Sequence, residues 1–260
     1  MRTNLNSTFR IPHSAFAALA AFALFTTIPC APAQSVWGSA LSFNGVDQYL
    51  AMPTNTWFSN DLTIEAWVYE RGYSSYSRLV DFGNGAAFDN VVVALTSGTT
   101  GRPYFEVDAS GVARSLIVPT AIPINQWVHL AVTLQGSNAT IYVNGVAVVS
   151  TNNMPPPNAV LRTNNYVGRS NWAGNSYANA VFDDLRIWSV ARSQSDLQAN
   201  MTHPLTGAEA NLVAYYRFDE GGGVMAYDAS PNRRHGTLVN RPVRVPSNWS
   251  PVVTLNSPNR

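Results

Sequence analysis

Apolar and polar residues alternate with a period of two along most of the chain, beginning at Ser39. The segment 62–70 shows this clearly, because Leu62, Ile64, Ala66 and Val68 would share one face of a strand. Alternation with this period is typical of β-strands that bury one face. The other segments predicted as strands are 40–43, 48–52, 78–82, 90–95, 104–107, 113–118, 127–134, 140–143, 146–149, 165–168, 180–188 and 211–218.

Local signals predict one tight hairpin and one helix. Asn144 and Gly145 stand between two strand segments, and this pair favours the two-residue type I′ turn. Ser193 with Asp196 three residues later is typical of a helix start, so we expect a short helix to about Met201. We expect residues 235–239 to pair beside the strand 211–218.

These elements predict an all-β fold, an antiparallel two-sheet sandwich with one short C-terminal helix. Turn-rich segments separate the strands, but no Pro-rich linker divides them, so we expect a single monomeric domain over residues 36–240. Pro, Ser and Asn are frequent in 241–260, which we expect to be a loose tail.

The first 33 residues have the order of a secretory signal peptide. Basic residues come first, an uninterrupted apolar run fills 15–25, and small residues flank Pro32 before a cleavage site after Ala33. This run is shorter than the ~20 residues that span a bilayer, so we expect no membrane insertion. The chain is therefore predicted to be secreted, periplasmic or on the cell surface. An alternative is that Cys30, the only cysteine, becomes a lipidated N-terminus.

Charge is sparse and balanced. Only 12% of the 260 residues are charged, the formal net charge is +1, and all 16 basic residues are Arg. This composition gives no electrostatic case for nucleic-acid binding. A chain cleaved after Ala33 has no cysteine, so its stability would rest on its core or on a metal ion.

Six fragments of the sequence together form a recognisable set. They are Leu41-Ser-Phe-Asn-Gly-Val-Asp-Gln-Tyr-Leu50, Leu62-Thr-Ile-Glu-Ala-Trp-Val68, Trp127-Val-His-Leu-Ala-Val-Thr133, Ile141-Tyr-Val-Asn-Gly145, Tyr166-Val-Gly-Arg169 and Phe182-Asp-Asp-Leu-Arg-Ile-Trp-Ser-Val-Ala-Arg192. In this order they resemble the laminin-G-like, concanavalin A-like jelly-roll domains of secreted bacterial proteins. The resemblance implies two stacked, curved antiparallel sheets and a role in binding glycans or protein surfaces, mostly without catalysis.

No residue pattern predicts an enzyme. Glucanases with this architecture use two carboxylates about 5–5.5 Å apart on one strand. We identify no predicted strand with such an alternating set: Glu65 and Glu70 would point to opposite faces, and so would the adjacent Asp183 and Asp184. A nucleophile elbow and a zinc-protease histidine pattern are also missing from the sequence. A polysaccharide hydrolase or lyase with an unfamiliar residue set remains an alternative.

Four residues are candidates for a calcium site. Asn44 and Asp47 share one tight turn, and the resemblance implies that Asp183 and Asp184 lie near it. Calcium prefers carboxylate, amide and carbonyl oxygens. The alternative is that Asn44 and Asp47 only form Asx turns, which need no ion.

Aromatic residues in two polar loops are the candidate ligand site, because flat rings and amide groups bind sugars. Trp172, Tyr177 and Asn171 lie in the loop 169–177, and Tyr73 and Tyr76 lie in 72–76. The expected partner is carbohydrate, including surface glycoconjugates. The alternatives are adhesion to a cell-surface or matrix protein, and rings that fold back to cover the sandwich edge.

Overall fold

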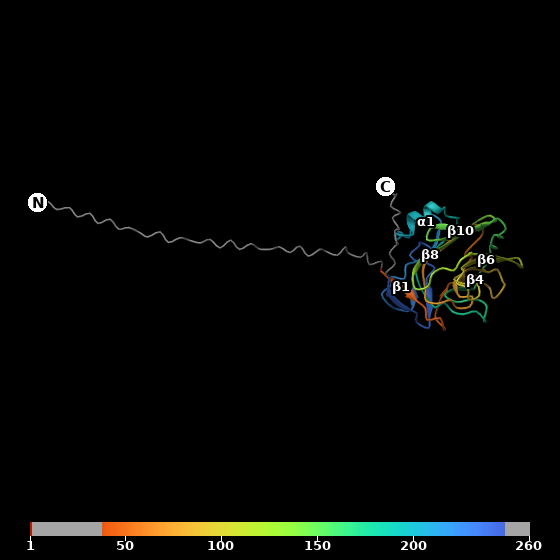
Figure 1. Ribbon diagram of the computed structural model, residues 1–260, viewed down its shortest axis with the longest axis horizontal. Helices are drawn as coiled ribbons and strands as arrows, with labels where there is room; N and C mark the ends of the chain where they lie inside the picture. Colours follow the sequence, from red (N-terminus) through yellow and green to blue (C-terminus); the bar gives the residue numbers. More distant parts are fainter. Residues whose placement is uncertain (2–37, 248–260) are drawn as a thin grey trace. The chain divides into compact units, whose positions relative to one another are not determined.

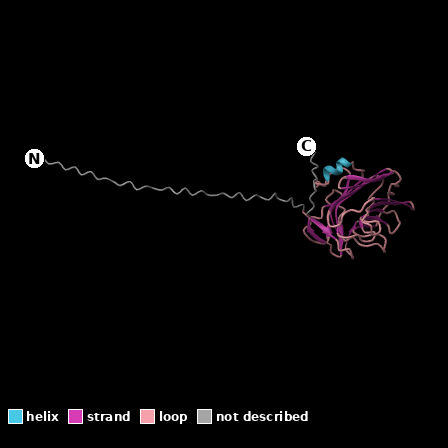
Figure 2. Ribbon diagram, in the orientation of Figure 1, coloured by secondary structure: helices cyan, strands magenta, loops and turns pink. Residues whose placement is uncertain are grey.

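The computed structural model describes Met1 and residues 38–247, and these form strands with a single short helix (Figure 2). The predicted signal peptide and residues 248–260 lie outside the described residues. The elements are β1 (Ser39–Ser42), β2 (Tyr49–Met52), β3 (Leu62–Glu70), β4 (Arg78–Gly83), β5 (Val91–Ala94), β6 (Tyr104–Ala109), β7 (Val112–Ile117), β8 (Trp127–Gln135), β9 (Asn138–Val143), β10 (Val146–Thr151), β11 (Asn164–Val167), β12 (Ala180–Trp188), α1 (Gln194–Asn200), β13 (Leu212–Tyr216), β14 (Met225–Ala226), β15 (Gly236–Val239) and β16 (Val243–Pro246).

The strands form two eight-stranded antiparallel sheets. Sheet A has the order β10-β9-β8-β3-β12-β1-β16, with β13 paired to β12, and sheet B has the order β14-β15-β2-β11-β4-β5-β6-β7. One large apolar core contains the inward side chains of both sheets, including every second residue of β3 from Leu62 to Val68. The predicted two-sheet sandwich and the predicted faces of this strand are therefore confirmed.

Both local predictions are confirmed as well. Asn144 and Gly145 have φ values of 51° and 72°, as a type I′ turn requires, and they join β9 to β10. Ser193 and Asp196 form a reciprocal capping box at the start of α1. The helix packs on sheet A, where Leu197 contacts Ala131 on β8 and Tyr142 on β9 (Figure 1). No helix in the described part of the chain is long and apolar enough to cross a bilayer.

Two strand assignments differ from the sequence prediction. β15 pairs with β2 and β14 rather than with β13, which pairs with β12 instead. Residues 243–246, expected within the loose tail, form β16 along the edge of sheet A against β1. An edge position tolerates Pro246, because an edge strand leaves some backbone N–H groups outside the ladder.

Three tryptophans lie on strands of sheet A, and two of them are buried. Trp67 and Trp188 are 4% and 0% exposed, and both lie on strands of sheet A. Trp67 donates its indole N–H to the Met201 carbonyl at 2.7 Å, just after α1. Trp127 is only half-buried, at the start of β8, where its ring packs edge-on against Tyr69.

Candidate functional site

The outer face of sheet B, opposite its core face, brings together polar and aromatic residues from distant parts of the sequence. Strand register sets their order: Tyr166 on β11 lies opposite Asp81 on β4, Asp81 opposite Val92 on β5, and Val92 opposite Glu106 on β6. A second row on the same face lies beside the first, because side chains alternate along each strand. In this row Arg78 lies opposite Ala94, Ala94 opposite Tyr104, and Tyr104 opposite Ile117.

The loop 169–177, which follows β11, is fastened to this face by Asp81. Asn171 donates its backbone N–H to Asp81 Oδ2 at 3.0 Å and its side-chain Nδ2 to Oδ1 at 2.8 Å. Asn90 Nδ2 donates to Oδ1 at 3.0 Å, and Arg78 forms an ion pair with Oδ2 at 3.5 Å. Burial raises the pKa of Asp81, while Arg78 and these donors oppose the shift.

Trp172, in the middle of this loop, lies half-buried on the sheet. Its ring packs against the buried cluster of Val92, Ala94 and Tyr104. Arg78 Cζ lies 5.6 Å from the Trp172 ring and 5.4 Å from the Tyr104 ring, within cation–π distance. Tyr76, which is 42% exposed, meets Tyr104 edge-on at 6.4 Å. These four side chains, Trp172, Arg78, Tyr104 and Tyr76, form what we call the Trp172 cluster.

A second group, the tyrosine–arginine cluster, consists of Tyr49, Tyr166, Tyr177 and Arg169. The Tyr49 ring lies 5.5 Å from Tyr166 and 6.1 Å from Tyr177. Arg169 Cζ lies 4.7 Å from the Tyr49 ring centre and 4.5 Å from that of Tyr166. All four residues are partly exposed. The sequence prediction missed three of these residues, because only strand register shows that Tyr49 on β2 and Tyr166 on β11 are neighbours.

Glu106 and Asp108 occupy alternate positions of β6, so both point to the outer face. This corrects the interpretation that no strand carries alternating carboxylates. Burial raises the pKa of Glu106, and the charges of Asp81 and Asp108 add to that effect against the opposing charge of Arg78. Burial also raises the pKa of Asp108, with Asp89 adding to it. The next alternate position, Ser110, carries no carboxylate.

The five predicted ligand residues are thus divided. Trp172 and Tyr76 meet in one cluster, and Tyr177 belongs to the other. Asn171 directs its amide at Asp81, so its role is to fix the loop. Tyr73 lies apart from both clusters: its hydroxyl donates to the Ile122 carbonyl at 2.6 Å, and its ring packs against Gly101 so closely that a Cβ there would meet it at 2.3 Å.

The turn predicted to bind calcium is closed by its own hydrogen bonds. Asn44 Oδ1 accepts the backbone N–H groups of Val46 at 2.9 Å, Asp47 at 3.2 Å and Gln48 at 3.3 Å. Asn44 Nδ2 donates to Asp47 Oδ1 at 2.9 Å. The amide oxygen proposed as a ligand is therefore already used by three donors, as in an Asx turn.

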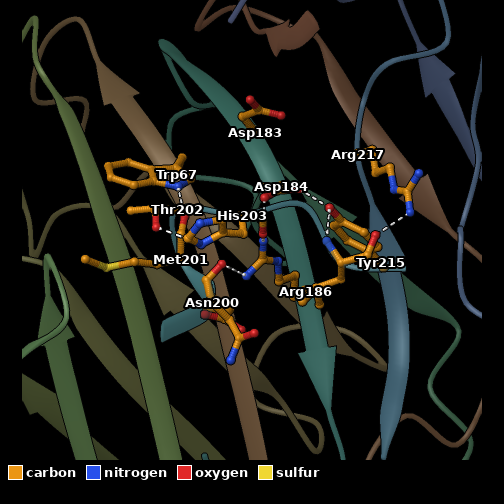
Figure 3. Close-up of polar contacts among 12 residues, drawn as sticks. Trp67, Asp183, Asp184, Arg186, Asn200, Met201, Thr202, His203, Tyr215 and Arg217 are labelled. Carbon is orange, nitrogen blue, oxygen red and sulfur yellow. Dashed lines mark hydrogen bonds and ion pairs between the residues drawn. The ribbon is translucent and has the colours of Figure 1, made fainter. Parts of the chain in front are cut away.

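Asp183 and Asp184 do not lie near that turn. Leu41 lies opposite Phe182, so Asp183 lies opposite Ala40, while the turn lies beside Ala178, whose carbonyl accepts the Gly45 N–H. Asp183 is therefore separated from Asn44 by four residues of strand, or roughly 13 Å. Asp184 has a φ of 55°, and its Oδ2 lies 2.6 Å from Arg186 Nη2. Its other carboxylate oxygen accepts a hydrogen bond from the Tyr215 hydroxyl, whereas the side chain of Asp183 points away from Arg186 and Tyr215 (Figure 3). Asp183 accepts a hydrogen bond from Ser247 Oγ.

The four predicted calcium ligands are thus not brought together in one place. Within residues 38–247, no group of three or more His, Cys, Asp or Glu side chains could hold a metal ion.

Solved structures resemble this chain in fold. A candidate carbohydrate-binding protein from Bacteroides ovatus is 20% identical with a TM-score of 0.61, over 82% of this chain and 60% of the other, so this chain spans less than two thirds of that protein. Domain 4 of the arabinanase AbnA from Geobacillus stearothermophilus, in complex with arabinotriose, is 23% identical with a TM-score of 0.51, over 62% and 75%. The CBM40 domain of the Ruminococcus gnavus IT-sialidase is 12% identical with a TM-score of 0.52, over 62% and 95%.

None of the curated proteins matches the sequence. A family does match it over residues 44–198, more than half of the chain, and those residues span β2 to β12 and most of α1. The two antiparallel sheets are the architecture that the sequence resemblance implied. The chain belongs to the concanavalin A-like lectin/glucanases superfamily.

Proposed function

We propose that this protein is a secreted, non-catalytic module that binds carbohydrate on the outer face of sheet B. The observation that carries the proposal is the pair of aromatic clusters on that face. Partly exposed rings on that face carry or adjoin polar groups that make no hydrogen bond within the described chain. The hydroxyls of Tyr49, Tyr166 and Tyr177 have no hydrogen-bond acceptor within residues 38–247.

Sugar rings present both apolar C–H faces and a rim of hydroxyl groups. A site for them needs aromatic surface for the faces and placed polar groups for the rim. The tyrosine–arginine cluster offers three hydroxyl-bearing rings, of which Tyr49 packs against the other two. The Trp172 cluster offers Trp172 and Tyr76 near the carboxylate of Glu106. The carbohydrate-binding descriptions of the Bacteroides and Ruminococcus proteins support this proposal by analogy.

A hydrolase is the second candidate, because Glu106 and Asp108 point to the same face of β6 and Glu106 has a raised pKa, as a general acid requires. Two observations favour binding instead. Trp172 packs against the apolar cluster that contains Val92, and Val92 lies opposite Glu106, so this carboxylate has an apolar neighbourhood on that side. The remaining carboxylate of the row, Asp81, is held by Asn171 and Arg78 and is fully buried.

We propose export because residues 1–33 follow the order of a signal peptide, and a glycan-binding module would meet its ligand outside the cell. N-terminal sequencing of the protein recovered from the medium or periplasm checks this. The expected first residue is Gln34. A lipidated Cys30 or an uncleaved chain would contradict it.

A glycan array followed by calorimetric titration tests the binding proposal. We expect the wild-type protein to bind at least one oligosaccharide, and Tyr166→Ala to weaken that binding about tenfold or more. Tyr227→Ala is the matched control, since Tyr227 is 52% exposed and lies outside both clusters. Release of new reducing ends or unsaturated sugars from the bound polysaccharide, abolished by Glu106→Gln, would favour the hydrolase or lyase. Absence of any bound glycan would contradict the proposal.

A further inference from the structure

Arg169 holds its positive charge between two aromatic rings of the tyrosine–arginine cluster. Its guanidinium carbon lies 4.5 Å and 4.7 Å from the ring centres of Tyr166 and Tyr49, and those two rings stand at 89° to each other. A guanidinium within cation–π distance of two rings that form a corner is restricted in the positions it can take. The side chain is therefore positioned although it is partly exposed.

This guanidinium has no acidic partner among the described residues. Other arginines do: Arg78 is paired with Asp81, Arg186 with Asp184 and Arg244 with Glu220. Asp81 lies on the strand next to Tyr166, but its two oxygens already accept from Arg78, Asn90 and Asn171. The side chain of Arg169 makes no hydrogen bond within residues 38–247, so stacking accounts for its contacts there.

Because the Arg169 side chain makes no hydrogen bond within residues 38–247, the N–H edge of its guanidinium is available to a ligand. That edge carries donors in a fork that matches both oxygens of a carboxylate, and such bidentate pairs are among the strongest polar contacts in proteins. The Tyr49 and Tyr166 rings adjoin this guanidinium and the Tyr177 ring adjoins Tyr49, so their hydroxyls are available to the hydroxyl groups of a sugar ring bound there. A neutral sugar would use these hydroxyls but would leave the fork without an anion.

We infer that the glycan recognised on this face carries a carboxylate, as in a uronic or sialic acid, and that Arg169 binds it. The inference rests on the proposed function, because it names the class of sugar for the same face. It assigns Arg169 as the residue that distinguishes acidic from neutral glycans.

Calorimetric titration of the full chain with matched pairs of saccharides tests the inference. The pairs are trigalacturonate with its methyl ester, sialyllactose with lactose, and glucuronoxylotriose with xylotriose. We expect an acidic member to bind the wild type at least tenfold more tightly than its neutral partner, and 0.5 M NaCl to reduce that preference. Arg169→Gln should remove the preference, so that the acidic and neutral members of a pair bind with similar affinity.

Two further variants make the result specific. Arg114→Gln removes the same charge from an exposed position on β7 and should bind as the wild type does. Arg169→Lys keeps a charge without the planar fork and should show a reduced preference, and it replaces Arg169→Gln if that variant does not fold. Equal binding of both members of every pair, or an acidic preference that survives both Arg169 substitutions, would overturn the inference while the proposed function stands. Absence of binding to any member would overturn both.

Discussion

Asn171 donates two hydrogen bonds to Asp81, one from its backbone and one from its side chain, and so joins the loop 169–177 to the middle of sheet B. Both ends of the candidate glycan site depend on this junction. Arg169 lies two residues before Asn171 and Trp172 lies one residue after it. A buried carboxylate on β4 thus sets the position of the residues that we propose to contact the ligand.

Replacement of Asp81 by Ala should therefore destabilise the protein and disturb the loop. It would leave Arg78 as a buried charge without its partner, which costs about 3–5 kcal/mol of unfolding free energy. Asn171→Ala removes one of the two hydrogen bonds and should cost about 1–2 kcal/mol. Denaturant unfolding followed by tryptophan fluorescence measures both, with the exposed Asn152→Ala as control. An unchanged midpoint in Asp81→Ala would mean that the loop is held in another way.

The buried carboxyl group of Glu70 should make the protein less stable at alkaline pH. Its side chain is buried, neither carboxylate oxygen has a hydrogen-bond partner within the described chain, and burial raises its pKa to about 8. Because this folded-state pKa lies above the ordinary value of 4.5, the folded state binds more protons than the unfolded state between these two pH values. The contribution of Glu70 to stability is then complete below about pH 4.5. It is lost as pH rises toward 8, at a rate of at most about 1.4 kcal/mol per pH unit.

Glu70→Gln should remove this dependence, since a neutral amide has no proton to lose. We expect its melting temperature to exceed that of the wild type at pH 9 and the difference to shrink at pH 5. Glu209→Gln is the control. Although partial burial opposes it, hydrogen bonds from Thr206 and Gly207 lower the pKa of Glu209, so this variant should gain no alkaline stability. Parallel pH curves for wild type and Glu70→Gln would show that Glu70 finds a partner in solution.

Trp172→Ala separates a binding role from a purely structural one. The ring is half-buried against the cluster of Val92, Ala94 and Tyr104, so its removal should cost about 1–3 kcal/mol, below the about 3–5 kcal/mol expected for the fully buried Trp188. Urea unfolding measures both variants. A cost equal to that of Trp188→Ala would mark Trp172 as a core residue.

Calcium should not stabilise this protein through the four residues predicted from the sequence. The side chains of Asn44 and Asp47 form a hydrogen bond with each other. Asp184 forms an ion pair with Arg186, away from that turn. We expect the melting temperature to be the same in 5 mM calcium chloride as in 5 mM magnesium chloride. A rise specific to calcium that Asp47→Asn removes would place an ion at the turn after all.

Sequence periodicity is sufficient to predict the sandwich but not the site. The alternation in Leu62–Glu70 shows directly which side chains enter the core, since it depends on neighbours along one strand. The partnership of Tyr49 with Tyr166, or of Asn171 with Asp81, depends on which strands pair and in which register, and alternation within a strand carries no such information. For the same reason β16, a short strand interrupted by Arg244 and ended by Pro246, was expected to be loose.

A crystal structure of the protein with its bound saccharide tests the central claim most directly. The account predicts sugar density on the outer face of sheet B, in contact with the Tyr49 and Tyr166 rings and with a carboxylate at the Arg169 guanidinium. Density in another hollow, such as the one lined by Thr206, Asp228 and His235, with the Arg169 side chain untouched, would contradict it.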